Sequence, residues 1–238
     1  MERNPRVELV HRFFSGTGST YDFMVNLCTL GFDPCWKKKI LKGIPKGSVR
    51  ILDQACGTGI LTFKIARMFP HSRVIGVDLL EEYLNIAKEK ARRQNSENVE
   101  FMLGSAEEVL LLENFDCITS SYLAKYAKLE SLIRNARKML RSGGVLIMHD
   151  FTYPPNPAFA RLWESYFQIL QRVGRWKYPQ WEAIFEGLPE LLRGTKWVTK
   201  LTRSLRENAF SEISMQSLTL GTSAIVIARK NQASLKIH

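Results

Sequence analysis

The stretch that decides the fold is ILDQACGTGIL, residues 51–61. An apolar run ends there at Asp53, and Gly57 and Gly59 then leave the backbone almost without side chains. Glycine adopts backbone conformations that other residues avoid and lets a ligand lie against the main chain, while the first turn of a following helix offers unpaired N–H groups. The stretch therefore predicts a buried strand, a tight ligand-binding loop and a helix.

The glycine loop lacks the signatures of two common phosphate-binding loops. No GxxxxGK[ST] motif is present, and the full GxGxxG pattern fails because an Ile-Leu-Thr run follows Gly59. Instead, acids end two successive strand-like runs, since Asp53 precedes the glycines and Asp78 closes the run SRVIGVD. An acid at the second position can accept hydrogen bonds from ribose hydroxyls. The spacing indicates a nucleoside-binding site.

Strand-like and helix-like runs alternate along the first two thirds of the chain. Short apolar runs rich in β-formers lie at 49–55, 72–78, 98–103, 115–121 and 144–151, and helical spacing follows several of them. Such alternation is typical of parallel strands joined by right-handed crossovers. Beyond residue 152, a helical insertion precedes two strand-like runs at 210–218 and 222–230. We predict an α/β fold: a Rossmann-like, doubly wound, mostly parallel seven-stranded sheet with an antiparallel terminal strand, an N-terminal helical segment and a helical insertion after the fifth strand.

Composition limits the classes of protein. The chain has 238 residues, 45% of them apolar, which is enough for one sizeable core. No apolar run approaches the roughly 20 residues that span a bilayer, and the N-terminus is too charged for a secretory signal, so we expect a cytoplasmic protein. The four cysteines show no CxxC spacing and no nearby histidine pair, which argues against a metal site.

The net charge of +11 invites an anionic partner. Basic clusters lie at 37–42, 90–93 and 196–206, but none carries interleaved aromatic residues at the spacing of a base-stacking platform. A solvated basic surface and an anionic membrane stay open as explanations, and nucleic acid is disfavoured.

These motifs resemble those of the class I S-adenosylmethionine-dependent methyltransferases. DQACGTG (53–59) matches the first motif of that family, VIGVD (74–78) matches the second, and the later strands match FMLGSAEE, FDCITSS and LRSGGVLIMHDF. Within the superfamily the chain is similar to the UbiE-type C-methyltransferases of ubiquinone and menaquinone biosynthesis. FFSGTGSTYDFMVNLCTLGFDPCWKK (13–38) resembles their N-terminal segment, and LDQACGTGILT resembles their first motif, alanine included. The resemblance spans roughly residues 9–230.

The resemblance implies S-adenosyl-L-methionine as cofactor and S-adenosyl-L-homocysteine as product. It assigns cofactor contacts to Thr58, Asp78, Ser105, Ala106 and Ser121. On physical grounds Asp53, Gly57 and Gly59 complete the cradle. We expect one methyltransferase domain over 1–238, divided into an N-terminal helical cap (1–45), a cofactor-binding core (46–151), a helical insertion over the acceptor site (152–194) and a last helix with the terminal strands (195–230).

The acceptor side departs from the UbiE pattern. In SYLAKY, Lys125 and Tyr126 stand where that family usually has an Arg-Asn pair, and Asp150 begins a DFTYP run in place of Glu-Phe-Ser-x-Pro. Methylating a ring carbon ortho to a phenol needs alignment above all, with one base near the acceptor. We expect Asp150 to be the catalytic base, with Tyr21 as second choice. The other candidates are Asp22, Lys125, Tyr126 and His149.

The insertion is rich in aromatic residues, which could wall an acceptor channel, lie at a membrane surface or form an ordinary core-facing stripe. They are Phe159, Trp163, Tyr166, Phe167, Trp176, Tyr178 and Trp181. We predict C-methylation of a lipophilic, demethylmenaquinol-like quinol or a related aromatic compound, with peripheral contact to an anionic membrane at its inner face; a homodimer is compatible with the sequence. The alternatives are O- or N-methylation of another small molecule, methylation of RNA, and a non-catalytic cofactor-binding protein.

Overall fold

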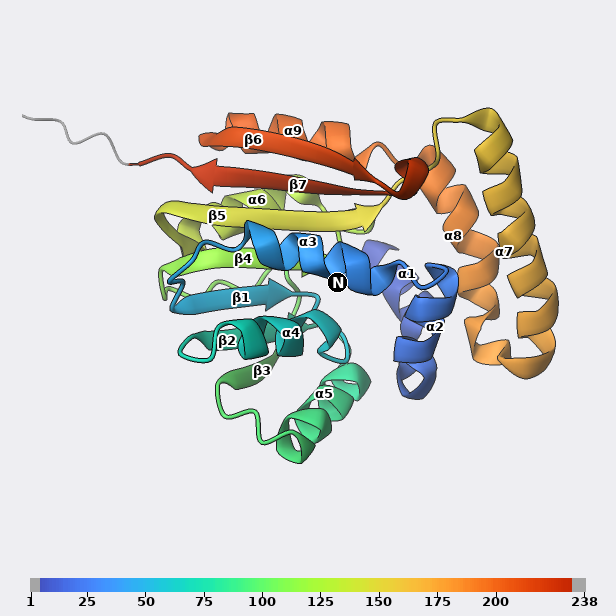
Figure 1. Cartoon of the computed structure of the whole chain (residues 1–238), viewed down its shortest axis with the longest axis horizontal. Helices are drawn as coiled ribbons and strands as arrows, with labels where there is room; N and C mark the ends of the chain where they lie inside the picture. Colours follow the sequence, from blue (N-terminus) through green and yellow to red (C-terminus); the bar gives the residue numbers. More distant parts are fainter. Residues whose placement is uncertain (1–4, 233–238) are drawn as a thin grey trace, which may run out of the picture.

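A seven-stranded sheet lies at the centre of the chain, whose residues 5–232 are described by a computed structural model (Figure 1). The strands are β1 (Arg50–Gln54), β2 (Arg73–Asp78), β3 (Val99–Leu103), β4 (Phe115–Ser121), β5 (Leu140–Phe151), β6 (Phe210–Leu218) and β7 (Ser223–Lys230), in the order β3-β2-β1-β4-β5-β7-β6. The first five pair in parallel, and β7 runs antiparallel to both β5 and β6. The predicted doubly wound sheet with its antiparallel terminal strand is confirmed. The ends of the predicted domain, 1–4 and 233–238, lie outside the described residues.

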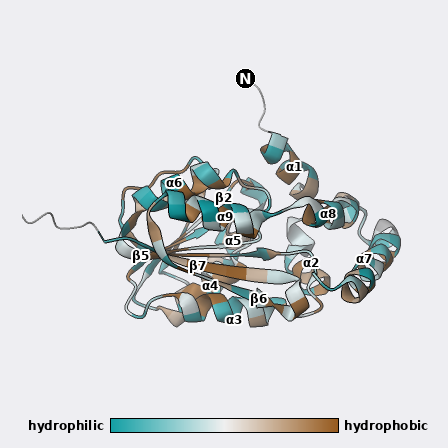
Figure 2. Cartoon of the chain, turned by 90° about the horizontal axis from the view of Figure 1, so that it is seen from above, coloured by the Kyte–Doolittle hydropathy of each residue, from teal (hydrophilic) through white to brown (hydrophobic). Residues whose placement is uncertain are grey.

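Helices cover both faces of the sheet. One face carries α3 (Asp33–Gly43) and α4 (Ile60–Met68), and the other carries α6 (Leu129–Met139) and α9 (Trp197–Glu207), while α5 (Glu81–Arg93) packs on β2 and β3 (Figures 1 and 2). Figure 2 shows apolar residues gathered along β7, between the helical layers. Burial of this apolar surface is the main term that stabilises the layers.

The join between α6 and β5 differs from the sequence prediction. The run SGG at 142–144 predicts a glycine cap that ends the preceding helix. In the structure α6 ends at Met139 and the strand begins at Leu140. Leu140 pairs with Phe115, and the register then shifts by the time Cys117 pairs with Val145. Gly143, with φ of +73°, lies in this irregular segment. The glycines therefore accommodate a bulge in the strand and do not end the helix.

The remaining helices gather beyond the carboxyl ends of β1, β4 and β5 (Figure 1). They are α1 (Pro5–Phe14), α2 (Tyr21–Cys28), α7 (Pro157–Lys177) and α8 (Glu182–Gly194), with short 3-10 turns at Gly18–Thr20, Pro179–Trp181 and Thr219–Gly221. The side chain of Asn156 caps α7 by accepting the N–H groups of Ala158 and Phe159. These helices stand over the edge of the sheet where ligands bind in open α/β folds.

Candidate functional site

The loop after β1 is held in conformations that only small or strained residues adopt. Ala55, Gly57 and Gly59 have φ values of +54°, +58° and +85°. A Cβ at Gly59 would lie 2.5 Å from the ring of Phe63, so no larger residue fits there without displacing that ring. Glycine is therefore required at Gly59 by the packing of α4 as well as by its backbone.

Asp78, at the end of β2, ties this loop to the next one. Its Oδ2 accepts the N–H of Gly57 at 2.8 Å, and its Oδ1 accepts the N–H of Leu80 at 2.9 Å. The side chain is buried, and this burial raises the pKa of its carboxyl group. The sequence predicts Asp78 as a ligand of ribose, and in the structure it also fixes the glycine loop.

Asp53 lies deeper, beneath the loop. Its carboxylate accepts the hydroxyl protons of Thr62 at 2.7 Å and Thr119 at 2.8 Å. Burial raises the pKa of this carboxyl group to about 6, although both hydroxyls oppose the shift. Asp53 lines neither of the cavities described below. Asp53 therefore stabilises the first turn of α4 through its hydrogen bond with Thr62.

A first cavity opens above the glycine loop and encloses about 790 Å³, including space open to solvent. Five of the predicted cofactor contacts line it: Gly57, Asp78, Ser105, Ala106 and Ser121. Thr58 and Gly59 are not among the lining residues. The Thr58 hydroxyl donates instead to Asp22 of α2, and Lys90 of α5 bonds the same carboxylate at 2.5 Å. The side chain of Thr58 thus holds α2 against the core.

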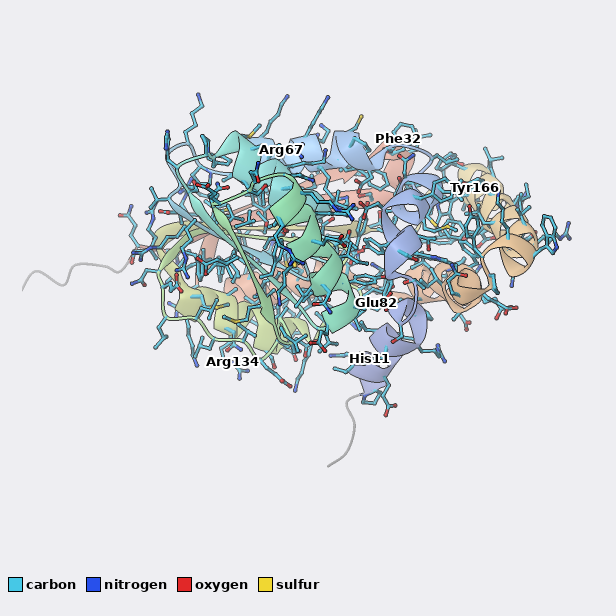
Figure 3. The ribbon with its side chains drawn as sticks, turned by 90° about the horizontal axis from the view of Figure 1, so that it is seen from below. His11, Phe32, Arg67, Glu82, Arg134 and Tyr166 are labelled. Atoms are coloured by element: carbon cyan, nitrogen blue, oxygen red, sulfur yellow. The ribbon has the colours of Figure 1, made fainter. Side chains whose placement is uncertain are left out.

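The N-terminal helices roof the first cavity. Val7, Val10 and Phe14 of α1 and Tyr21 of α2 form part of its lining. Glu82, at the start of α5, accepts the N–H groups of Gly16 at 2.9 Å and Gly18 at 2.8 Å. Figure 3 shows Glu82 at the end of α5 that faces α1 and α2. No sequence motif singles out Glu82, because an acid in the first turn of a helix is common for electrostatic reasons alone.

A second, strongly apolar cavity of about 410 Å³ adjoins the first. The two share the aromatic residues Phe14, Tyr21, Tyr122 and Tyr126 as a common wall. The other lining residues come from α2, the segment after β4, the end of β5, and α8 with its preceding turn: Met24, Val25, Cys28, Lys125, Phe151, Trp181, Ile184 and Leu188. The first cavity, which Asp78 and Ser105 line, and the more strongly apolar second cavity therefore meet at a wall of aromatic rings.

Lys125 and Asp150 form a buried ion pair beside the apolar cavity. Lys125 Nζ donates to Asp150 Oδ1 at 2.7 Å, and both side chains are almost fully shielded from solvent. Asp150 also accepts the N–H groups of Lys125 at 3.0 Å and Phe151 at 2.7 Å. Asp150, the expected base, therefore lies behind Lys125 and does not line either cavity.

A second buried ion pair stands on α3. Lys37 Nζ lies 3.1 Å from Asp33 Oδ1 and donates to Ser121 Oγ at 2.5 Å. The hydroxyl of Tyr122 donates to Asp33 at 2.6 Å, and the Tyr122 backbone has a φ of +69°, which is strained for an aromatic residue. This ion pair is not predictable from local sequence, because Lys37 is the first residue of a basic run that is typical of a solvated surface.

His149 continues this buried network. Its Nδ1 lies 2.9 Å from Ser121 Oγ, and its Nε2 lies 2.6 Å from Ser223 Oγ. Burial lowers the pKa of the imidazole, and Lys37 adds to that effect. Both ring nitrogens are occupied, so the structure places His149 in support of Ser121 and outside the cavities.

Known proteins resemble this chain in sequence and in fold. The chain matches the profile of the ubiE/COQ5 methyltransferase family over residues 2–230. The chain belongs to this family. It is 26% identical to the demethylmenaquinone methyltransferase of Staphylococcus aureus (strain JH9) over 234 residues, 96% of each chain. The resemblance predicted from the motifs is therefore confirmed.

Solved structures share the fold of this ubiE/COQ5 family member. A protein from Methanococcus maripaludis described as an S-adenosyl-L-methionine-dependent methyltransferase superposes with a TM-score of 0.65 at 16% identity, covering 92% of this chain and 94% of the other. Geranyl diphosphate C-methyltransferase from Streptomyces coelicolor, solved with S-adenosyl-L-homocysteine, gives a TM-score of 0.60 at 14% identity over 84% of this chain and 79% of the other.

The protein is therefore a methyltransferase that uses S-adenosyl-L-methionine, as expected. The first cavity fits this cofactor. Asp78 lines it with a carboxylate of the kind that accepts ribose hydroxyls, and Ala55 and Gly57, whose φ values are positive, leave the main chain open to a ligand.

Proposed function

We propose that this protein transfers the methyl group of S-adenosyl-L-methionine to a ring carbon of a lipophilic, demethylmenaquinol-like quinol. The observation that carries the proposal is the apolar cavity, which meets the cofactor cavity at a shared aromatic wall. A prenylated ring needs an apolar chamber next to the reactive methyl group, and the named activity of the S. aureus relative supports the same substrate class.

In this proposal the predicted cofactor residues divide into two groups. Asp78 bonds the ribose, Ser105 and Ala106 lie at the adenine, and Gly57 and Ser121 contact the remainder of the molecule. Asp53, Thr58 and Gly59 do not contact the cofactor in this proposal. They hold the loop, α2 and α4 in place. The division into cap (1–45), core (46–151), insertion (152–194) and terminal segment (195–230) belongs to the same proposal.

In this proposal the main contribution of the protein to catalysis is to align the acceptor ring with the methyl group of the cofactor. When bound, the cofactor supplies an electrophilic methyl group carried on a sulfonium. Tyr21 and Tyr126 lie on the shared wall, where they can fix the plane and the oxygen of the acceptor ring. Correct orientation of two reactants can lower a barrier by about 7–11 kcal/mol, far more than one general base provides. Asp150 contributes through Lys125, which it pairs and positions.

The experiment is a methyl-transfer assay with a short-chain demethylmenaquinol kept reduced under anaerobic conditions. Mass spectrometry should detect a product heavier by one methylene, dependent on S-adenosyl-L-methionine, with the new methyl group on a ring carbon. Catechol and a primary amine serve as matched O- and N-acceptors. Methylation of either of these, with none of the quinol, would contradict the proposal.

We further propose that the outer face of α7 contacts an anionic membrane. None of the described helices combines the length and apolarity needed to cross a bilayer. Of the aromatic residues in the insertion, Trp163, Phe167 and Trp181 are buried, as the core-facing alternative predicts. The exposed stripe on α7 consists of Leu162, Ile169, Val173 and Trp176, the last 88% exposed. Arg161, Arg172 and Lys177 are exposed beside it, a combination that suits lipid headgroups.

Reversing two of these charges tests the membrane contact. Arg161→Glu with Arg172→Glu is expected to weaken binding to phosphatidylglycerol-containing vesicles by about 10-fold or more, because each basic residue near such a surface contributes roughly 1 kcal/mol. Co-sedimentation measures this. The matched control reverses Arg134 and Arg137 on α6; Figure 3 shows Arg134 far from Tyr166 of α7. Equal vesicle binding by both variants would contradict the proposal. A homodimer through α7 is the competing proposal, and light scattering of the same variants tests it.

A further inference from the structure

Two polar groups that line the apolar cavity have hydrogen-bond partners in the protein. The Tyr122 hydroxyl donates to Asp33, and the Trp181 indole donates to Thr20 at 2.8 Å. Burial raises the pKa of the Cys28 thiol to about 12, so this group stays neutral. The cavity lining therefore contains no free carboxylate or imidazole that could act as a base.

Three groups retain unused donors. Within the part of the chain that the structure describes, the hydroxyls of Tyr21 and Tyr126 make no hydrogen bond to another protein group, and both residues line the apolar cavity. Lys125 Nζ donates to Asp150 Oδ1 and to the carbonyl of Tyr122 at 2.9 Å, which leaves one of its three N–H groups. That nitrogen lies 4.3 Å from the centre of the Tyr126 ring.

We propose that Lys125, Tyr126 and Tyr21 form an oxyanion site, which binds the ionised hydroxyl of the acceptor so that an aryloxide undergoes methylation. An ammonium and two hydroxyls fixed at an apolar cavity stabilise a negative oxygen strongly. A neutral quinone oxygen gains less from the same donors, so the site selects the reduced acceptor. The inference rests on the proposed function, since it assigns the acceptor oxygen in that same cavity.

The steps balance without a protein base. The acceptor hydroxyl releases its proton to water as the oxygen meets the three donors. The oxygen electron pair then delocalises into the ring, the ortho carbon bonds the methyl group, and the methyl–sulfur bond breaks. The ring proton at that carbon leaves to water, which restores the aromatic ring. Asp150 accepts the hydrogen bond of Lys125 throughout and holds that nitrogen in place.

The burial of Lys125 predicts that kcat falls at alkaline pH. Burial lowers the pKa of Lys125, while Asp150 opposes that effect. Because the pKa is lowered, Lys125 loses its proton at a lower pH than an exposed lysine, and kcat should fall as pH rises through that value. Arginine stays protonated, so Lys125→Arg should lack the alkaline fall.

The test uses 4-nitro-1-naphthol, whose ionised form absorbs visible light, bound to the protein with S-adenosyl-L-homocysteine. We expect binding to lower the pKa of the probe by about one unit or more. Lys125→Met should abolish the shift and lower kcat by about 100-fold with little change in KM for the quinol. Lys125→Arg should retain much of the probe's pKa shift and much of kcat. Lys200→Met, which changes an exposed lysine, is the control and should match wild type in both quantities.

Two further measurements distinguish a variant that has lost the oxyanion site from a variant that has failed to fold. Lys125→Met leaves Asp150 unpaired, so the double variant with Asp150→Asn is measured beside it, with thermal melting of each. An unshifted probe in wild type, or the same shift in the folded double variant, would overturn the oxyanion site. A shifted probe with no methylated quinol would instead refute the proposed function and leave the site standing.

Discussion

Asp78→Asn is expected to lower the affinity for S-adenosyl-L-homocysteine by about 100-fold. The carboxylate accepts N–H groups from Gly57 and Leu80, and in our proposal it also accepts the ribose hydroxyls. An amide has one oxygen and one NH₂ group, so a backbone N–H of the loop would face another donor. Each hydrogen bond to a charged group contributes about 1.5–3 kcal/mol, and the expected loss corresponds to about 3 kcal/mol.

Isothermal titration calorimetry measures this effect. The matched control is Glu100→Gln on the neighbouring strand β3, an exposed carboxylate paired with Arg73. It makes the same chemical change outside the cavity and should leave the affinity unaltered. Binding by Asp78→Asn within about 3-fold of wild type would show that the cofactor does not depend on this carboxylate.

Lys37→Met is expected to lower the free energy of unfolding by about 3–5 kcal/mol, because it leaves Asp33 as an unpaired buried charge. Lys37 is 2% exposed and Asp33 is 4% exposed, so water cannot take the place of the missing ammonium. The double variant Asp33→Asn with Lys37→Met removes both charges and should regain most of the loss, since the amide oxygen can still accept the Tyr122 hydroxyl.

Urea denaturation at pH 7 measures both variants. Lys42→Met, at an exposed position of the same helix, is the control and should change the stability by less than about 0.5 kcal/mol. If Lys37→Met were as stable as this control, the Lys37–Asp33 ion pair would not contribute to holding Tyr122 and Ser121 in place.

The sequence allowed the fold and half of the site to be predicted because their signals are local. Apolar periodicity defines each strand, and the positions of Asp53, Gly57, Gly59 and Asp78 follow from where strands end. Parallel strands end at one edge, so residues distant in sequence meet there without further information. This is why Asp78 and Ser105 could be placed near the same cavity.

The acceptor side depends on contacts that local patterns do not encode. Lys37 and Lys125 look like surface lysines in sequence, and only the packing of α3 and of the segment after β4 buries them against Asp33 and Asp150. Asp150 is predicted to be the catalytic base from its position at the end of a strand, but the sequence gives no sign that Lys125, 25 residues earlier, pairs with it. Helical spacing on α7 likewise left open which apolar residues face the core.

The aromatic wall has a thermodynamic consequence. Because Phe14, Tyr21, Tyr122 and Tyr126 border both cavities, a ligand that orders these rings from one side changes the free energy of binding on the other. Linkage then requires reciprocity: if the cofactor raises the affinity for the acceptor by some factor, the acceptor raises the affinity for the cofactor by the same factor. A shared wall thus couples the two occupancies with no hinge and no moving domain, and it favours the simultaneous presence of both reactants over either one alone.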